Sequence, residues 1–330
     1  MDLSKAKNIL IVRLSSLGDI LLTTPLVRSL KNQYPNLNID FVVRDIFADA
    51  ILYNPHINNI YKITKDQNFI ELRNNIIKIN YDIVIDLQNN LRSRKLTKSI
   101  SKNIFRFKKP NVNKFLLVQF KVNRFKETIS IPERYAKSLP NFNLDNKSLE
   151  LFLPKDIKPN IEKTLNVIGL CPGSVHKTKM WLEEYFIELG NMFVQNNYKV
   201  VLFGGKSDRE ICQRISKQIS KSIDLSNDNK LFELSANMRM CKTVICNDSG
   251  LMHTAVGSGV PVVAIFGSTV KEFGFTPYKT KSLVIENNEL TCRPCSHIGL
   301  DECPKKHFEC MKKLTPQMVF EQTQNFIESL

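Results

Sequence analysis

The chain has 330 residues, 42% hydrophobic and 24% charged, a composition typical of globular proteins with one or two domains. No apolar run approaches the ~20 residues of a membrane span, and the first one stops at Arg13, too early for a signal peptide, so we expect a cytoplasmic protein with its eight cysteines as thiols. The net charge of +15, from 47 basic and 32 acidic residues, favours an acidic partner, although a general Lys and Asn bias also explains it.

The first half alternates short apolar runs with segments of helical periodicity, which predicts a parallel, doubly wound sheet. One helix begins near Asp19 and ends before Pro35, and Pro25 either bends it or marks its true first turn. Strands are predicted at residues 8–13, 39–43, 60–63 and 83–87, and further helices at 46–52, 69–79 and 133–139.

Asp19 follows the first predicted strand, at the sheet edge where open α/β folds place their chemistry. The residue has two interpretations. It is either a general base or a helix N-cap, a position that Asp fills well. From the residue alone, the N-cap is favoured.

Residues 92–126 contain twelve Lys or Arg and no Asp or Glu, with five phenylalanines interleaved. A solvated basic face is the ordinary explanation. The phenylalanines make attachment to anionic lipid, or binding of a phosphorylated acceptor, nearly as good an explanation. No nucleic-acid-binding module surrounds the run. The polar, proline-containing residues 140–159 indicate a linker between domains.

The second half repeats the alternation, so we predict two Rossmann-like domains, residues 1–155 and 156–330, with a crevice between them. No GxGxxG follows the first strand, which argues against a dinucleotide oxidoreductase. Strands are predicted at 167–170, 199–203, 243–246 and 262–266, and helices at 181–196, 208–219, 231–240 and 315–330.

The stretch 244–268 combines a strand, a helix that starts near Ser249 and ends at Gly257 and Gly259, and a second strand. The free N–H groups and the dipole of that helix form a ready phosphate site at the strand's carboxyl end, unless the unit is an ordinary βαβ motif without a ligand. Lys179 follows another strand and is placed to neutralise a diphosphate leaving group, although taken alone it is as well explained as a surface lysine.

Four cysteines lie within nineteen residues near the end of the chain. Structural zinc, a disulfide and buried thiols remain open for this cluster, with His297 and His307 as substitute metal ligands. The four are Cys292, Cys295, Cys303 and Cys310.

Four motifs occur in order along the chain: SSLGD at 15–19, CPGS at 171–174 followed by KMW at 179–181, FGG at 203–205, and NDSGLMH at 247–253. Together they resemble glycosyltransferase family 9, the ADP-heptose:lipopolysaccharide heptosyltransferases. The CPGS and NDSGLMH motifs are most similar to the heptosyltransferase II group. The resemblance spans nearly the whole chain, and the cysteine cluster resembles a tail found in part of the family.

The resemblance implies a GT-B fold, with an acceptor-binding domain at 1–155 and a nucleotide-sugar-binding domain at 156–330. It implies inversion at the anomeric carbon without a required cofactor or catalytic metal, ADP-heptose as donor, and a phosphorylated lipid A–Kdo acceptor. The enzyme would be cytoplasmic and peripheral to an anionic inner membrane, with no nucleic-acid partner.

The resemblance also assigns roles to individual residues. Asp19 matches the general base, and Lys179 the lysine that contacts the donor's phosphate and sugar. The remaining matches are Ser174 near the diphosphate, Asp208 near the ribose, Asp248 at the sugar, and Ser249, Gly250, Leu251 and His253 at the phosphate-binding helix start. Val175 departs from the family pattern, which often has a second hydroxyl there.

Three alternatives remain at this stage. The first is a family 9 enzyme that uses a different nucleotide-sugar, and the second is a sugar-nucleotide epimerase, which shares the GT-B layout. The third is a membrane- or nucleic-acid-binding protein that uses the basic run.

Overall fold

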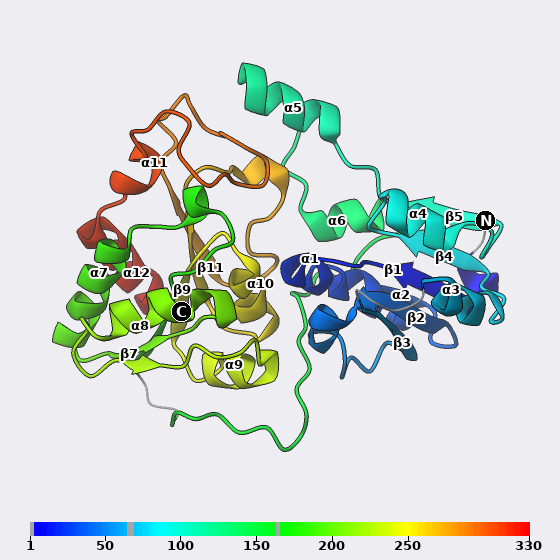
Figure 1. Ribbon diagram of the computed structural model, residues 1–330, viewed down its shortest axis with the longest axis horizontal. Coiled ribbons are helices and arrows are strands. Elements are labelled where there is room, and N and C mark those ends of the chain that lie inside the picture. Colours follow the sequence, from blue (N-terminus) through cyan, green and yellow to red (C-terminus); the bar gives the residue numbers. More distant parts are fainter. Residues whose placement is uncertain (1–2, 65–68, 163–165) are drawn as a thin grey trace. The chain divides into compact units, whose positions relative to one another are not determined.

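The computed structural model describes residues 3–64, 69–162 and 166–330, and the chain divides into two compact units (Figure 1). The first consists of Met1–Lys109 and Ile131–Phe152, and the second of Pro110–Ser130 and Leu153–Leu330. Each unit is built on one parallel sheet.

The sheet of the first unit has five strands in the order β3-β2-β1-β4-β5. Its central strand is continuously apolar and buried, because helices cover both faces of a parallel sheet. The order reverses between β1 and β4, so the loops after these two strands border the crevice where such sheets bind ligands. The strands are β1 (Asn8–Val12), β2 (Asn38–Arg44), β3 (Asn59–Ile63), β4 (Ile83–Asp86) and β5 (Asn103–Arg106).

The helix predicted after Asp19 is in fact two helices, α1 (Leu17–Leu21) and α2 (Thr24–Gln33). Pro25 lies in the first turn of α2, where its fixed φ fits and its missing N–H costs no hydrogen bond. The other helices of the unit are η1 (Leu3–Lys5), η2 (Asp45–Ala50), α3 (Phe69–Ile77), α4 (Leu91–Thr97) and α6 (Ile131–Ala136).

A buried arginine fastens the end of the first unit to α2. Arg28 is 4% exposed and donates to both carboxylate oxygens of Asp145, at 2.6 and 2.7 Å. It also pairs with Glu150 at 3.1 Å. The residues after α6 therefore return to the first unit before the chain crosses to the second.

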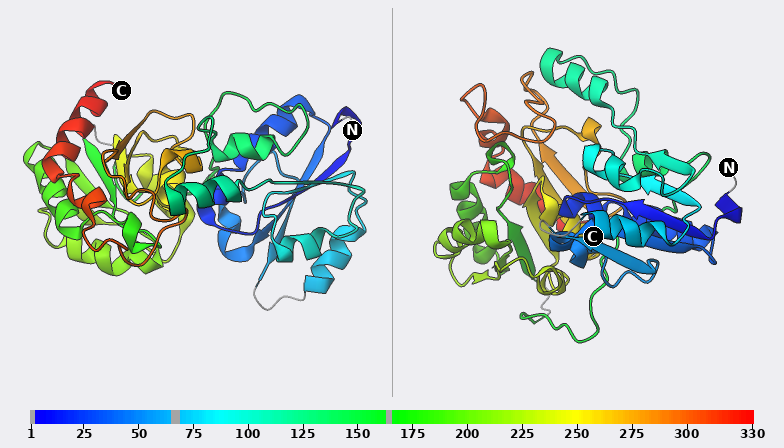
Figure 2. Two further views of the ribbon diagram at one scale, coloured as in Figure 1. Left: turned by 90° about the horizontal axis from the view of Figure 1, so that it is seen from above. Right: turned by 45° about the vertical axis from the view of Figure 1, so that its right-hand side comes forward.

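The sheet of the second unit has six strands in the order β11-β10-β9-β6-β7-β8 (Figure 2). Its order reverses between β6 and β9, so the loops after these strands carry the CPGS and NDSGLMH motifs to the switch point. The strands are β6 (Val167–Cys171), β7 (Lys199–Leu202), β8 (Ile223–Asp224), β9 (Thr243–Asn247), β10 (Val262–Phe266) and β11 (Ser282–Glu286).

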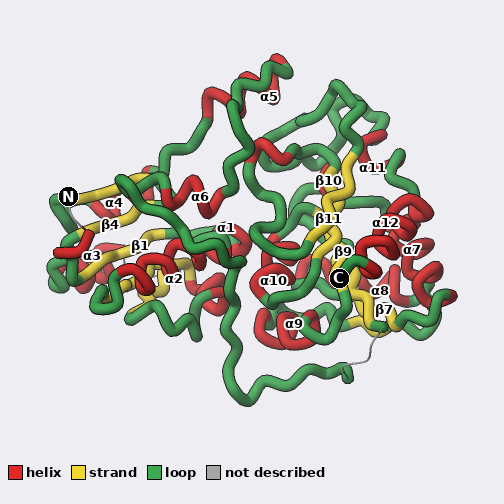
Figure 3. The backbone as a smooth tube through the Cα atoms, turned by 180° about the vertical axis from the view of Figure 1, so that it is seen from behind, coloured by secondary structure: helices red, strands yellow, loops and turns green. Residues whose placement is uncertain are grey.

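Helices pack around this sheet and supply most of the large core side chains, among them Trp181, Phe186 and Phe193 (Figure 3). The predicted strand–helix–strand stretch is confirmed as β9, α10 and β10. The helices are α5 (Asn111–Phe120), η3 (Lys177–Lys179), α7 (Glu183–Gln195), η4 (Lys206–Asp208), α8 (Arg209–Ser216), α9 (Leu231–Met238), α10 (Gly250–Gly257), η5 (Lys271–Phe273), α11 (Glu309–Lys312) and α12 (Pro316–Glu328).

Residues 110–130 lie inside the range predicted for the first domain but make their contacts in the second unit. Lys121 Nζ donates to the carbonyl of Pro294 at 2.7 Å, and Asn123 donates to Glu272 at 3.2 Å. The basic run is therefore shared between the units. Across the described ranges, no helix is both long and apolar enough to cross a membrane.

Candidate active site

Asp19 is the third residue of α1, directly after the loop that follows β1. Its Oδ2 accepts hydrogen bonds from the backbone N–H of Ser16 at 3.1 Å and from the Ser16 hydroxyl at 2.9 Å. Its Oδ1 pairs with Nη2 of Arg13 at 2.8 Å. Ser16, and not Asp19, is therefore the N-cap residue, and the carboxylate closes the first turn from inside the helix.

The pKa of Asp19 reflects two opposing effects. Burial raises it, but the charge of Arg13 and the hydrogen bonds from Ser16 lower it by more, so the net pKa lies below the ordinary value. The carboxylate is ionised at neutral pH, and a group that accepts a proton must start in that form.

Arg13 is the residue that sequence reasoning missed in this half of the site. Besides Asp19, it donates to the carbonyls of Ser15 at 2.8 Å and Leu87 at 2.7 Å, and its guanidinium lies 5.7 Å from the ring centroid of Tyr135. One side chain thus joins the loops after β1 and β4 to α6. The available signal was a charged residue at the end of an apolar, buried strand.

Further cations lie near Asp19, around Asn89 in the loop after β4. The carbonyl of Asn89 accepts from Lys109 Nζ at 3.3 Å, and its Oδ1 accepts from Arg94 Nε at 2.9 Å. Burial lowers the pKa of Lys109, and the charges of Arg13 and Arg94 lower it further. This edge of the first sheet therefore favours an anionic group.

In the second unit, three loops converge on Asp248, which follows β9. Its Oδ2 pairs with Lys179 Nζ at 2.8 Å and accepts from the hydroxyl of Thr269 at 2.7 Å. Lys179 ends η3, and Thr269 follows β10. The structure thus brings together two predicted site residues, Lys179 and Asp248, and adds Thr269, which sequence reasoning did not single out.

The start of α10 adjoins Asp248. Ser249 is the N-cap residue with extended backbone, and Gly250 and Leu251 open the helix, where backbone N–H groups lack helical partners. Within the described parts of the chain, the Oγ of Ser249 is buried without a hydrogen-bond partner. His253 lies in the first turn and is buried. This end of α10 offers donors and positive potential to an anion.

Ser174 and Asp208 belong to loops at the same sheet edge. A Cβ on Gly173 would lie 2.2 Å from Cγ of Asp208, so only glycine allows this carboxylate to pack against the CPGS loop. Asp208 Oδ2 accepts from the N–H of Gly205 at 3.1 Å. Ser174 is half-buried, and Val175 beside it is 89% exposed.

Asn247 ties these loops together and was also missed. It is fully buried, donates to the carbonyl of Pro172 at 2.7 Å, and accepts from the N–H of Trp181 at 2.9 Å. The side chain therefore fixes the loop of Lys179 relative to the strand end that carries Asp248. A fully buried Asn at a strand end, next to an Asp, was the available signal.

The sequence matches the model of glycosyltransferase family 9 (heptosyltransferase) over residues 69–306. The chain belongs to glycosyltransferase family 9. It is 28% identical to lipooligosaccharide heptosyltransferase 2 of Campylobacter jejuni over 327 residues, covering 95% of this chain and 96% of that one. The resemblance inferred from the four motifs is confirmed, and the chain is a glycosyltransferase.

Solved structures of the family share the fold of this glycosyltransferase. A family 9 glycosyltransferase from Veillonella parvula superposes with a TM-score of 0.78 at 23% identity, covering 100% of this chain and 99% of that one. The Escherichia coli ADP-heptose lipopolysaccharide heptosyltransferase II gives a TM-score of 0.72 at 22% identity, covering 98% and 99%. The predicted GT-B fold is confirmed.

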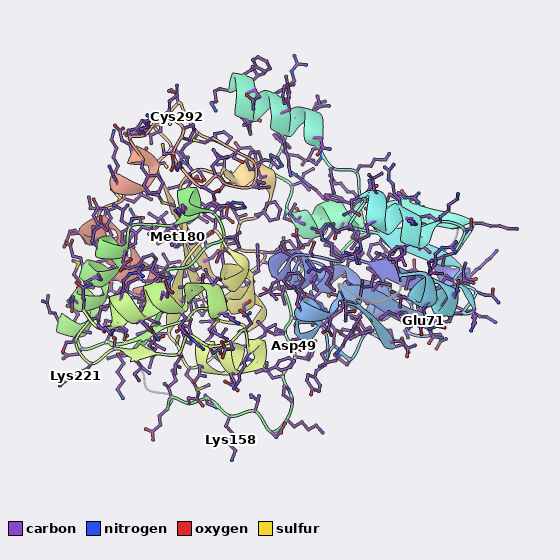
Figure 4. The ribbon with its side chains drawn as sticks, in the orientation of Figure 1. Asp49, Glu71, Lys158, Met180, Lys221 and Cys292 are labelled. Carbon is purple, nitrogen blue, oxygen red and sulfur yellow. The ribbon has the colours of Figure 1, made fainter. Side chains whose placement is uncertain are left out.

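The cysteine-rich residues 292–310 of the glycosyltransferase brace the loops around Asp248. Buried Arg293 donates to the carbonyls of Gly267 and Thr269 and pairs with Glu286 at 2.7 Å. Leu300 and Thr178 exchange two hydrogen bonds, at 3.0 and 2.8 Å, next to Lys179. Figure 4 labels Cys292 in this segment and Met180, the residue after Lys179.

The four clustered cysteines are free thiols in the structure, as are the other four. Cys292 Sγ lies 3.8 Å from His307 Nε2, but no three His, Cys, Asp or Glu side chains in the described ranges are arranged to hold a metal ion. Burial raises the pKa of Cys310 to about 12 and also raises that of Cys295, which favours the protonated thiols.

A hollow of about 380 Å³ lies between η3 and the cysteine-rich segment. It contains none of the predicted site residues, so the Asp248 cluster remains the candidate donor site. Its lining residues are Lys177, Thr178, Asp301, Glu302, Cys303, Lys306 and Phe308.

Proposed function

We propose that this glycosyltransferase moves heptose from ADP-heptose to a phosphorylated lipid A–Kdo acceptor of the lipopolysaccharide inner core, as a heptosyltransferase of the II type. In this proposal the second unit binds the donor and the first unit binds the acceptor. The observation that carries it is the cluster at the switch point of the second sheet, where Lys179, Thr269 and Asp248 meet beside the open hydroxyl of Ser249.

The donor diphosphate would bind at the start of α10. The N–H groups of Gly250 and Leu251, the Ser249 hydroxyl and the helix dipole all favour negative charge at this point. Ser174 would supply a further hydroxyl to the diphosphate, Asp208 would face the ribose, and His253 would support the helix start.

Departure of ADP increases the negative charge on its terminal phosphate. Lys179 lies 2.8 Å from Asp248 and is 14% exposed, so its ammonium is held at the site and remains reachable. With the α10 N–H groups it would stabilise the leaving group, so we propose that transfer requires no cofactor and no catalytic metal. Asp248 and Thr269 would contact the sugar.

Asp19 would act as the general base. The acceptor hydroxyl forms a bond to the anomeric carbon as the bond from that carbon to the ADP oxygen breaks, which inverts the configuration. The hydroxyl proton passes to the Asp19 carboxylate, whose lowered pKa keeps it ionised and ready. Lys109 and Arg94 would hold an acidic group of the acceptor nearby, and the enzyme would work at the cytoplasmic face of the inner membrane.

A thermal-shift screen of nucleotide-sugars tests the donor assignment, because a ligand that binds only the native state raises its melting temperature. We expect ADP-heptose to give the largest shift. A larger shift with another nucleotide-sugar would replace the donor, and consumption of ADP-heptose without acceptor would favour an epimerase.

The base assignment is tested by Asp19→Asn, which should keep the donor-induced shift and reduce transfer by about 10²–10⁴-fold. The matched control is Asp45→Asn, because Asp45 is an exposed carboxylate of the same unit with a weak 4.0 Å ion pair. Turnover near the control value would overturn the assignment. Full activity after exhaustive chelation is expected, and lasting inactivation would refute the metal-free mechanism.

A further inference from the structure

Residues 110–126, here called the α5 arm, are held on the second unit by one side only. Leu117 is the buried side chain of α5, and Lys114 Nζ lies 5.8 and 5.9 Å from the ring centroids of Phe273 and Phe275. After the helix, Lys121 donates to the Pro294 carbonyl. These contacts fix the arm close to the cysteine-rich segment that braces the donor loops.

The other side of the arm is apolar and exposed. Val112 is 70% exposed, Phe115 57%, Phe120 63% and Val122 44%. On the helix, Val112 and Phe115 lie opposite Leu117. Phe115 and Phe120 contact each other edge to face, with ring centroids 5.9 Å apart. Figures 1 and 3 show α5 at the edge of its unit, reached by loops at both ends.

The charges around this apolar face have one sign. Residues 92–126 contain no Asp or Glu, and the arm's own Arg124 and Lys126 are exposed. Large apolar side chains flanked by basic ones are the composition of segments that lie in the interface of an anionic bilayer. A protein partner with an apolar groove would not require this charge, so the charge selects lipid as the occupant.

We infer that the α5 arm docks the enzyme on an anionic membrane, with Val112, Phe115, Phe120 and Val122 entering the headgroup boundary and Arg124 and Lys126 contacting lipid phosphates. The inference deepens the proposed function, on which it rests for the lipid nature of the acceptor. It adds that the membrane contact is made by an element fixed to the nucleotide-sugar unit, next to the loops that bind the donor.

The experiment uses the full chain and large unilamellar vesicles of phosphatidylcholine with phosphatidylglycerol, compared with phosphatidylcholine alone. Phe115→Trp reports insertion, because the chain's own Trp181 is 1% exposed and gives a constant background. We expect a blue shift of the new emission and its quenching by brominated lipid, both reduced by salt. Unchanged emission with anionic vesicles would overturn the inference.

Sedimentation with the vesicles measures affinity. Phe115→Ser with Phe120→Ser should weaken binding at least tenfold, whereas Ile46→Ser with Ile70→Ser, 67% and 63% exposed in the first unit, should leave it unchanged. Arg124→Gln with Lys126→Gln should weaken binding roughly fivefold per charge, against the control Lys217→Gln with Lys221→Gln. Equal binding by variant and control would refute the docking role.

Two further measurements separate the outcomes. If the Phe115 and Phe120 substitutions change the sedimentation velocity of the free protein and not vesicle binding, a second copy covers the face and the inference is wrong. Transfer to a delipidated, water-soluble acceptor should be unaffected by the arm substitutions. Failure of the unsubstituted enzyme in that assay would refute the proposed function, independently of vesicle binding.

Discussion

Replacing Arg13 by Gln removes the positive charge that lies 2.8 Å from Asp19 and lowers the pKa of this carboxyl. An opposite charge at this distance lowers a carboxyl pKa by about 1–3 units. Without it, burial becomes the dominant effect, so the Asp19 pKa should rise above its ordinary value of 3.8. Glutamine retains a donor for the Leu87 carbonyl, which limits the loss of structure.

The assay is the pH dependence of kcat/KM for transfer to a soluble acceptor. If Asp19 is the base, the acidic limb should move to higher pH by about 1–3 units in Arg13→Gln. At pH values above the new limb, the rate should return, because a base with a higher pKa is at least as effective. Arg13→Lys keeps the charge and should move the limb much less.

The same substitution affects stability with a definite sign. The lowered pKa of Asp19 stabilises the folded state above the unfolded pKa of about 3.9, and this contribution is lost as the pH falls through the folded pKa. Arg13→Gln should therefore reduce the free energy of unfolding at neutral pH. The loss should stay below the ~3–5 kcal/mol of a fully buried pair, because Asp19 is 19% exposed. An acidic limb that does not move in a folded variant would refute Asp19 as the base.

Three other substitutions test the second unit. Lys179→Ala should weaken ADP-heptose binding and lower kcat, measured by calorimetry and by release of ADP, and unchanged kinetics would remove Lys179 from the site. Gly173→Ala should displace Asp208, because its Cβ would meet Cγ at 2.2 Å, and should raise the donor KM at unchanged acceptor KM; an unchanged donor KM would show that the contact does not matter. Trp181→Ala removes a 1% exposed core side chain and its hydrogen bond to the Leu314 carbonyl, and should cost about 3–5 kcal/mol in denaturant unfolding followed by circular dichroism; a cost below ~1 kcal/mol would contradict the packing described.

Periodicity was sufficient for the elements that are strongly apolar. The strands β1, β6, β9 and β10 were predicted because parallel, doubly buried strands are continuous apolar runs. In contrast, α4 and β5 lie inside the basic run and were missed. Their apolar positions are few, and tertiary contacts determine their structure. The edge strand β8 has two residues and gives no periodic pattern.

The candidate site divides in the same way. Motif residues such as Asp19, Lys179 and Asp248 were identified from their position after predicted strands. Their partners were not, because Arg13 and Thr269 belong to no motif and contact their carboxylates only after folding. The assignment of residues 110–130 to the second unit was also beyond the sequence, since it depends on single contacts such as that of Lys121 with Pro294.

The cysteine-rich segment has a mechanical consequence for the enzyme. It touches the loop of Lys179 through Leu300 and the loop of Thr269 through Arg293, and both loops end on the same oxygen of Asp248. The segment and the two loops form a closed ring of contacts, in which no member can shift without straining the others. Engineering of donor specificity should therefore treat residues 267–269, 177–179 and 292–300 as one coupled unit to be redesigned together.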